Sequence, residues 1–105
     1  MTALPTTDSL QALQAYVWAM NKERGFNTED PAKKMLMLTE EVGELAKAVR
    51  KVVGLKFDDT TSRTNVTEEI ADVLIVLLGL SSLLEVDAFS AVLAKEAKTR
   101  ERVWK

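Results

Sequence analysis

The sequence predicts an all-α fold of four helices. Apolar side chains recur at spacings of three and four residues in several segments, which is the pattern of amphipathic helices. Residues that favour helix starts precede these segments, and no stretch keeps the two-residue alternation typical of a half-buried strand. We therefore expect a protomer of the four-helix-bundle type, formed by a single domain over residues 1–105.

Capping residues predict the bounds of the first two helices. Asp8, with Gln11 three residues later, predicts the start of the first helix, and Gly25 predicts its end. A proline directly after Asp30 predicts the start of the second helix, because proline is favoured at the first helical position. The second helix is expected to run as far as the residue before Gly54.

Polar residues separate the second helix from the rest of the chain. Leu55–Thr64 is predicted to be a solvated linker, because it combines charged residues with several threonines. Asn65, with Glu68 in capping-box position, predicts the start of the third helix. Asp87 with Ser90 predicts the start of the fourth helix, which is expected to continue to the C-terminus.

The third helix contains an apolar run, Val73–Leu80, that covers all of its faces. A helix that is apolar on every side is expected to be buried on every side. Four short helices can hardly cover this run within one protomer, so we expect a homodimer or a dimer of dimers, a homotetramer. The fourth helix is predicted to turn its apolar residues inward: Phe89, Val92, Leu93 and Ala97.

Composition excludes several classes of protein and site. The net charge of −2 disfavours a nucleic-acid binder. The chain has no cysteine and no histidine, which rules out disulfides and thiolate sites and argues against zinc catalysis, histidine-containing di-iron centres and serine–histidine triads. Its longest apolar run is far shorter than the roughly 20 residues that span a membrane, and its N-terminus lacks the features of a signal peptide. We expect a cytoplasmic protein with no membrane partner.

Two pairs of carboxylates lie next to apolar residues on the second and third helices. Glu41 and Glu44 are three residues apart, as are Glu69 and Asp72, so each pair shares one helix face. Helices joined by one loop tend to be antiparallel neighbours, which would bring the two pairs together. Four like charges in one place need a cation, and an all-oxygen ligand set favours a hard ion such as Mg²⁺. A solvated acidic surface is the alternative interpretation.

The same residues carry a resemblance to a known family. Glu40-Glu41-x-x-Glu44, followed after 24 residues by Glu69-x-x-Asp72, resembles the signature of the MazG-type all-α nucleoside triphosphate pyrophosphohydrolases. The resemblance implies Mg²⁺, with Mn²⁺ as a substitute, and hydrolysis of a nucleoside triphosphate to monophosphate and pyrophosphate in nucleotide-pool housecleaning. It implies that Glu41, Glu44, Glu69 and Asp72 are the metal ligands. For the proton of the attacking water we expect Glu40 or one of the ligand carboxylates, such as Glu41, to be the acceptor.

Three residues of the fourth helix and one of the first are candidates for binding substrate. In the resembled family the last helix often carries lysine, asparagine and arginine; here Lys95 and Arg102 match, while Thr99 stands where asparagine is common. Basic residues late in a helix also favour the helix dipole without any ligand. Trp18 is a candidate for stacking on a nucleobase, although a lone tryptophan in a small bundle is more often core.

Two other functions stay open from the sequence. One is a non-enzymatic helical module for oligomerisation or adaptor contacts, whose acidic face is merely solvated. The other keeps the same metal site but hydrolyses a phosphoribosyl-linked nucleotide. Neither the base nor the sugar of the substrate can be chosen, because no motif in the chain encodes a base pocket.

Overall fold

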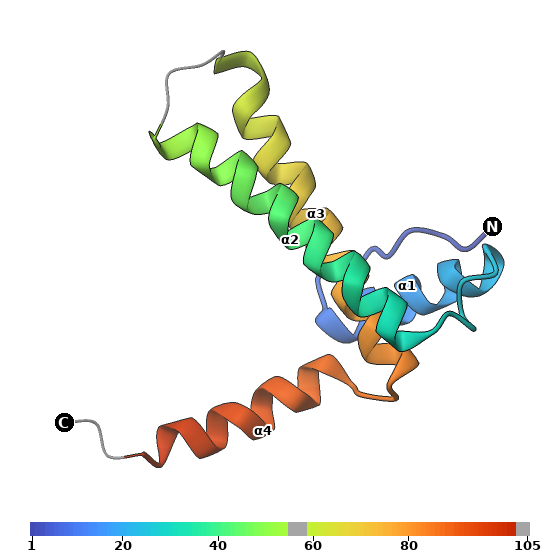
Figure 1. The fold of residues 1–105 in the computed structure, drawn as a ribbon. Coiled ribbons are helices and arrows are strands. Elements are labelled where there is room, and N and C mark those ends of the chain that lie inside the picture. The colour runs from blue at the N-terminus through green and yellow to red at the C-terminus, as the bar shows by residue number, and fades with distance from the viewer. Residues whose placement is uncertain (55–58, 103–105) are drawn as a thin grey trace.

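The computed structural model describes residues 1–54 and 59–102. The described part of the chain contains no strand, which confirms the predicted all-α fold (Figure 1). Its helices are α1 (Leu10–Glu23), α2 (Pro31–Gly54), α3 (Asp59–Leu83) and α4 (Ala88–Arg100). No single helix in the described residues is long and apolar enough to cross a membrane. The segment Asn65–Leu83 and α4, which meet at a bend of 92°, are together long and apolar enough, by length and composition alone.

Several predicted helix ends are confirmed. The Asp30 carboxylate accepts a hydrogen bond from the N–H of Ala32 at 2.9 Å, as expected for a residue preceding α2. The Asp87 carboxylate accepts hydrogen bonds from the N–H of Ser90 at 2.9 Å and from its hydroxyl at 2.7 Å. These bonds lower the pKa of Asp87 below its ordinary value. Gly25 follows α1 with a φ of +78°, in the left-handed region that glycine adopts without strain.

Two predicted helix starts are wrong. Ser9, not Asp8, caps α1, because the Ser9 hydroxyl oxygen accepts a hydrogen bond from the N–H three residues later at 3.1 Å. Asn65 is not a cap, because α3 already begins at Asp59 and takes in most of the predicted linker. Polar residues lower the helix propensity of a segment only slightly. Pairing with a second long helix can therefore outweigh this preference. The rest of the predicted linker, residues 55–58, lies outside the described residues.

Helices α2 and α3 form a long antiparallel pair, and α1 crosses α3 near its C-terminal end (Figure 1). The small core lies at this crossing, where Val17 and Met20 of α1 are buried together with Leu78 of α3, which is 1% exposed. Gly79 allows α1 to pass close to α3: a Cβ atom there would lie only 3.0 Å from the side-chain amide nitrogen of Asn21. The core therefore fixes α1 against one end of the α2–α3 pair.

A buried lysine closes the loop between α1 and α2. Lys34 is 5% exposed, and its ammonium group lies 2.8 Å from a carboxylate oxygen of Glu29. The same nitrogen lies 6.0 Å from the centre of the Phe26 ring. Burying a charged group is costly unless it is paired, so this ion pair holds the loop against the start of α2.

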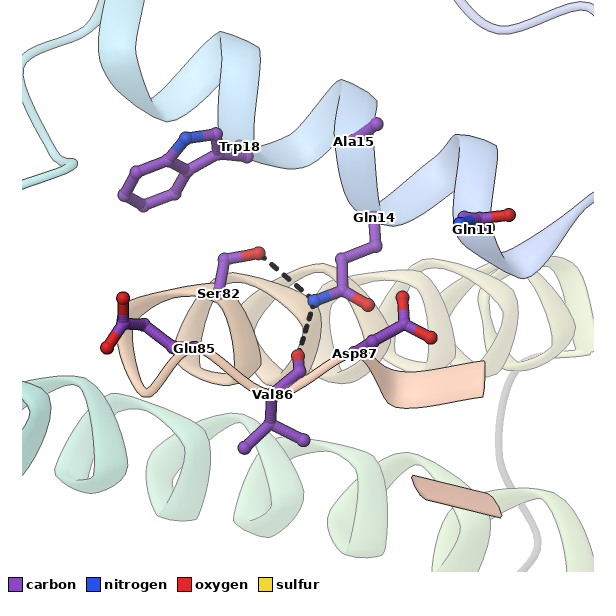
Figure 2. A pocket seen from close by; sticks show the side chains of 8 residues that line it. All are labelled: Gln11, Gln14, Ala15, Trp18, Ser82, Glu85, Val86 and Asp87. Atoms are coloured by element: carbon purple, nitrogen blue, oxygen red, sulfur yellow. Dashed lines mark hydrogen bonds between the residues drawn. The ribbon is translucent and has the colours of Figure 1, made fainter. Parts of the chain in front are cut away.

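A buried glutamine ties α1 to the turn before α4. The Gln14 amide nitrogen donates hydrogen bonds to the Ser82 hydroxyl oxygen at 3.1 Å and to the Val86 carbonyl oxygen at 2.8 Å (Figure 2). Its carbonyl oxygen accepts a hydrogen bond from the N–H of Ala88 at 2.9 Å. One side chain thus contacts the end of α3, the turn and the first residue of α4. It sets the direction in which α4 leaves the core.

Helix α4 packs mainly against α1 and extends away from the α2–α3 pair (Figure 1). The prediction that its apolar residues face inward is therefore wrong for a single protomer, since Phe89, Leu93 and Ala97 are exposed and Val92 is 58% exposed. The apolar run of α3 is also only partly covered: Leu78 is buried, but Ile75 is 48% exposed. One protomer leaves these apolar surfaces without a neighbour in the described part of the chain.

We expect Gln14→Glu to lower the free energy of unfolding by about 1–3 kcal/mol. The ionised side chain cannot donate the hydrogen bond that the Val86 carbonyl accepts from Gln14. Gln11→Glu is the matched control, because it makes the same chemical change at an exposed position of α1 and should stay within about 0.5 kcal/mol of wild type. Urea unfolding at fixed protein concentration measures both, and equal losses would contradict the role of Gln14.

Candidate functional site

The pairing of α2 with α3 gathers three carboxylates. Glu41 of α2 and Glu69 and Asp72 of α3 each offer an oxygen, and these oxygens all lie within 4.8 Å of one another. Glu41 and Glu69 are half-buried and Asp72 is exposed. We call these three residues the carboxylate group. The structure thus brings together three of the four predicted metal ligands.

The fourth predicted ligand, Glu44, lies one helical turn further along α2 and outside this group. Glu44 and Glu69 instead line an adjoining cavity of about 160 Å³ between α2 and α3. The other residues of its lining are Lys47, Ala48, Lys51 and Asn65. We call this space the hairpin cavity. Glu69 belongs to the carboxylate group and also lines the hairpin cavity, so the two are adjacent.

The electrostatics of Glu69 indicate a place for a cation. Its Oε2 atom is shielded from solvent and has no hydrogen-bond partner among the described residues. Partial loss of solvent raises the pKa of Glu69, and the negative charges of Asp72, Glu41, Glu44 and Glu68 raise it further. A shielded acceptor without a partner is unfavourable, and carboxylate oxygens are the ligands that Mg²⁺ prefers. The residues present therefore fit a hard divalent ion.

Glu40, a candidate for the catalytic base, is exposed on α2. It directly precedes Glu41 but does not belong to the carboxylate group. Consecutive residues of a helix point about 100° apart, so Glu40 borders the group from the side of α2 that faces solvent.

The three candidates from the C-terminal part of the chain lie apart from the carboxylate group. Lys95 and Thr99 belong to α4, and Arg102 follows it; Lys95 and Arg102 are exposed and Thr99 is half-buried. Because α4 extends away from the α2–α3 pair, a single protomer does not bring these residues to its own carboxylates (Figure 1).

Trp18 lines a pocket of about 510 Å³ between α1 and the α3–α4 turn (Figure 2). Ser82, which lines the same pocket, comes ten residues after Asp72 on α3, or about 15 Å along the helix axis. The pocket therefore lies at the C-terminal end of α3, whereas the carboxylate group lies near the middle of that helix. Within one protomer, Trp18 is not beside the predicted metal ligands.

The sequence interpretation missed the basic lining of the hairpin cavity. Lys47 comes three residues after Glu44, and Lys51 comes four residues after Lys47, so all three lie on one face of α2. This spacing was a usable signal, but lysines at the end of a long helix are ordinary surface residues. The packing of Asn65 and Glu69 of α3 beside them is what makes the lysines border a cavity, and the sequence pattern does not show this packing.

Comparisons with known proteins cover this same region. Residues 29–104 match the family model of the MazG nucleotide pyrophosphohydrolase domain. The chain is also 34% identical over 100 residues to a dATP/dGTP diphosphohydrolase of Cyanophage S-2L. That match covers 94% of this chain and 78% of the phage protein. The family match includes α2, α3 and all four predicted metal ligands.

We expect the metal-free protein to lose stability as pH rises above 4.5, the ordinary pKa of Glu69. The folded protein raises this pKa, so the stabilising contribution is complete below the ordinary value and is lost as the pH passes through the folded value. Glu69→Gln should flatten the dependence of Tm on pH above pH 4.5. Glu96→Gln, at an exposed position of α4, is the control and should keep the wild-type slope. Parallel curves for wild type and Glu69→Gln would contradict this assignment.

Proposed function

Because this chain belongs to the MazG nucleotide pyrophosphohydrolase family, we propose that it hydrolyses purine deoxynucleoside triphosphates to monophosphate and pyrophosphate with Mg²⁺. Membership of the family makes it a hydrolase that acts on the phosphoric anhydride bonds of nucleotides. The purine and deoxyribose parts of the proposal are supported by the name of the phage relative. We place this housecleaning activity in the cytoplasm, where the nucleotide pool is.

The observation that carries the proposal is the carboxylate group with the shielded oxygen of Glu69. Glu41, Glu69 and Asp72 would hold the ion, and Glu44 would complete the set from the next turn of α2. When bound, Mg²⁺ neutralises phosphate oxygens and lowers the pKa of water. Mn²⁺ favours a similar set of oxygen ligands and is the substitute to test.

The chain's own residues would divide the remaining tasks. Glu40 and Glu41 are the candidates for accepting the proton of the attacking water, since both lie beside the site on α2. Lys95, Thr99 and Arg102 would contact phosphate or sugar, and Trp18 would stack on the base. Since one protomer keeps these four apart from its carboxylates, a neighbouring protomer would have to supply them.

We propose that the protein is a homodimer or homotetramer. Val42 of α2, Ile75 of α3 and Val92 of α4 are all more than a third exposed in the protomer. Soluble monomers rarely leave extended apolar surface in water, and a second copy is the partner that would also complete the substrate site. Light scattering at micromolar concentration should give a multiple of 11.7 kDa. A mass of one protomer would contradict the proposal.

Hydrolysis in ¹⁸O-labelled water tests the reaction, with dATP and dGTP as first substrates and a phosphoribosyl-linked nucleotide for comparison. Attack at the α-phosphorus places the label in the nucleoside monophosphate. Label in pyrophosphate would indicate attack at the β-phosphorus. Release of orthophosphate with a diphosphate product would indicate loss of the γ-phosphoryl group. Either of these two results would contradict the proposed reaction.

Glu41→Gln should abolish Mg²⁺-dependent turnover in the same assay, because it removes one charge from the carboxylate group and keeps the side-chain volume. The metal-free variant should melt at the same temperature as wild type or higher, since like charges repel less. Glu96→Gln should keep wild-type turnover, because Glu96 is exposed and is not among the residues proposed to contact metal or substrate. Near-normal turnover of Glu41→Gln would contradict its assignment as a ligand.

A further inference from the structure

The hairpin cavity carries negative and positive side chains in a fixed order. Glu44 is followed along α2 by Lys47 and Lys51, and on α3 Glu69 is preceded by Asn65. Because the two helices are antiparallel, the glutamates lie at the end next to the carboxylate group. The second lysine and the asparagine lie at the other end, toward the α2–α3 connection.

The two lysines have no ion-pair partner in the described part of the chain. The ion pair found there is that of Lys34 with Glu29, at 2.8 Å. Lys47 is exposed and Lys51 is half-buried, and both line the same small space. A lysine in the last turn favours the helix dipole, which accounts for Lys51 in part. The dipole gives no reason for two ammonium groups and an amide to border one cavity, and neither lysine forms an ion pair with the two glutamates of the same lining.

A metal-bound polyphosphate has the complementary distribution of charge. Its metal end fits the carboxylates, while its terminal phosphates keep excess negative charge. A bare anion would be repelled by Glu44 and Glu69, so the cavity suits an anion that enters together with its ion. Lys47 comes six residues after Glu41, or about 9 Å along the axis of α2, and it lines the cavity that Glu69 shares with the carboxylate group.

We propose that Lys47 and Lys51, together with Asn65, bind the terminal phosphates of the substrate, the part that leaves as pyrophosphate. This proposal rests on the proposed function. It assigns the contacts with the terminal phosphates to the same protomer that supplies the carboxylates. The lysines act as point charges on flexible stems, which suits phosphates whose position changes when the leaving group separates. Asn65 can donate two hydrogen bonds to phosphate oxygens.

Calorimetric titration of inorganic pyrophosphate in the presence of Mg²⁺ tests the proposal without requiring turnover. Lys47→Met and Lys51→Met remove the charge and keep most of the stem. Each should weaken pyrophosphate binding about tenfold, and the double variant should weaken it further. Arg50→Met is the matched control: Arg50 is an exposed cation in the same turn of α2 that does not line the cavity, and its removal should leave the affinity within about twofold.

A titration with Mg²⁺ alone shows whether the two lysines bind phosphate or only hold the carboxylates in place for the metal. Mg²⁺ binding should survive in the double variant. Pyrophosphate affinity within about twofold of wild type would overturn the proposal, and so would equal losses of Mg²⁺ and pyrophosphate binding. The two proposals fail separately: a wild-type protein that binds pyrophosphate through these lysines but hydrolyses no triphosphate would contradict the proposed function and support this phosphate site.

Discussion

The antiparallel pairing of α2 and α3 is the constraint on which the site depends. It places carboxylates from both helices within 4.8 Å of one another, an arrangement that repulsion alone would prevent. The core around Leu78 fixes α1 against α3 six residues, or about 9 Å along the helix axis, beyond Asp72. Ala48 of α2, which lines the hairpin cavity beside Glu44 and Glu69, is buried as well. Apolar burial along the paired helices therefore offsets the repulsion between the carboxylates.

Helical spacing predicted the central part of this site well. Glu69 and Asp72 lie three residues apart on one helix, and Glu41 meets them because the two helices are neighbours; both facts follow from local geometry. The same reasoning could not place Glu44, which spacing assigned to the same group. A difference of one helical turn between two ligands depends on how the helices are shifted along each other, and the sequence pattern does not fix that shift.

The direction of α4 could not be predicted, for a different physical reason. It depends on Gln14, whose partners in the turn lie 68 to 74 residues further along the chain. In the sequence, a glutamine on an amphipathic helix looks like an ordinary surface residue. The apolar residues of α4 were likewise expected to face a core, because the pattern shows which face is apolar but not whether this protomer covers it. The start of α3 was misjudged because polar residues resemble a linker until a neighbouring helix supports them.

The attachment of α4 through one glutamine has a consequence for how such a fold can change over time. The hydrogen bonds of Gln14 fix an angle without burying much of the helix they hold. Substitutions in the turn can therefore change the direction of α4 while the α2–α3 pair keeps its shape.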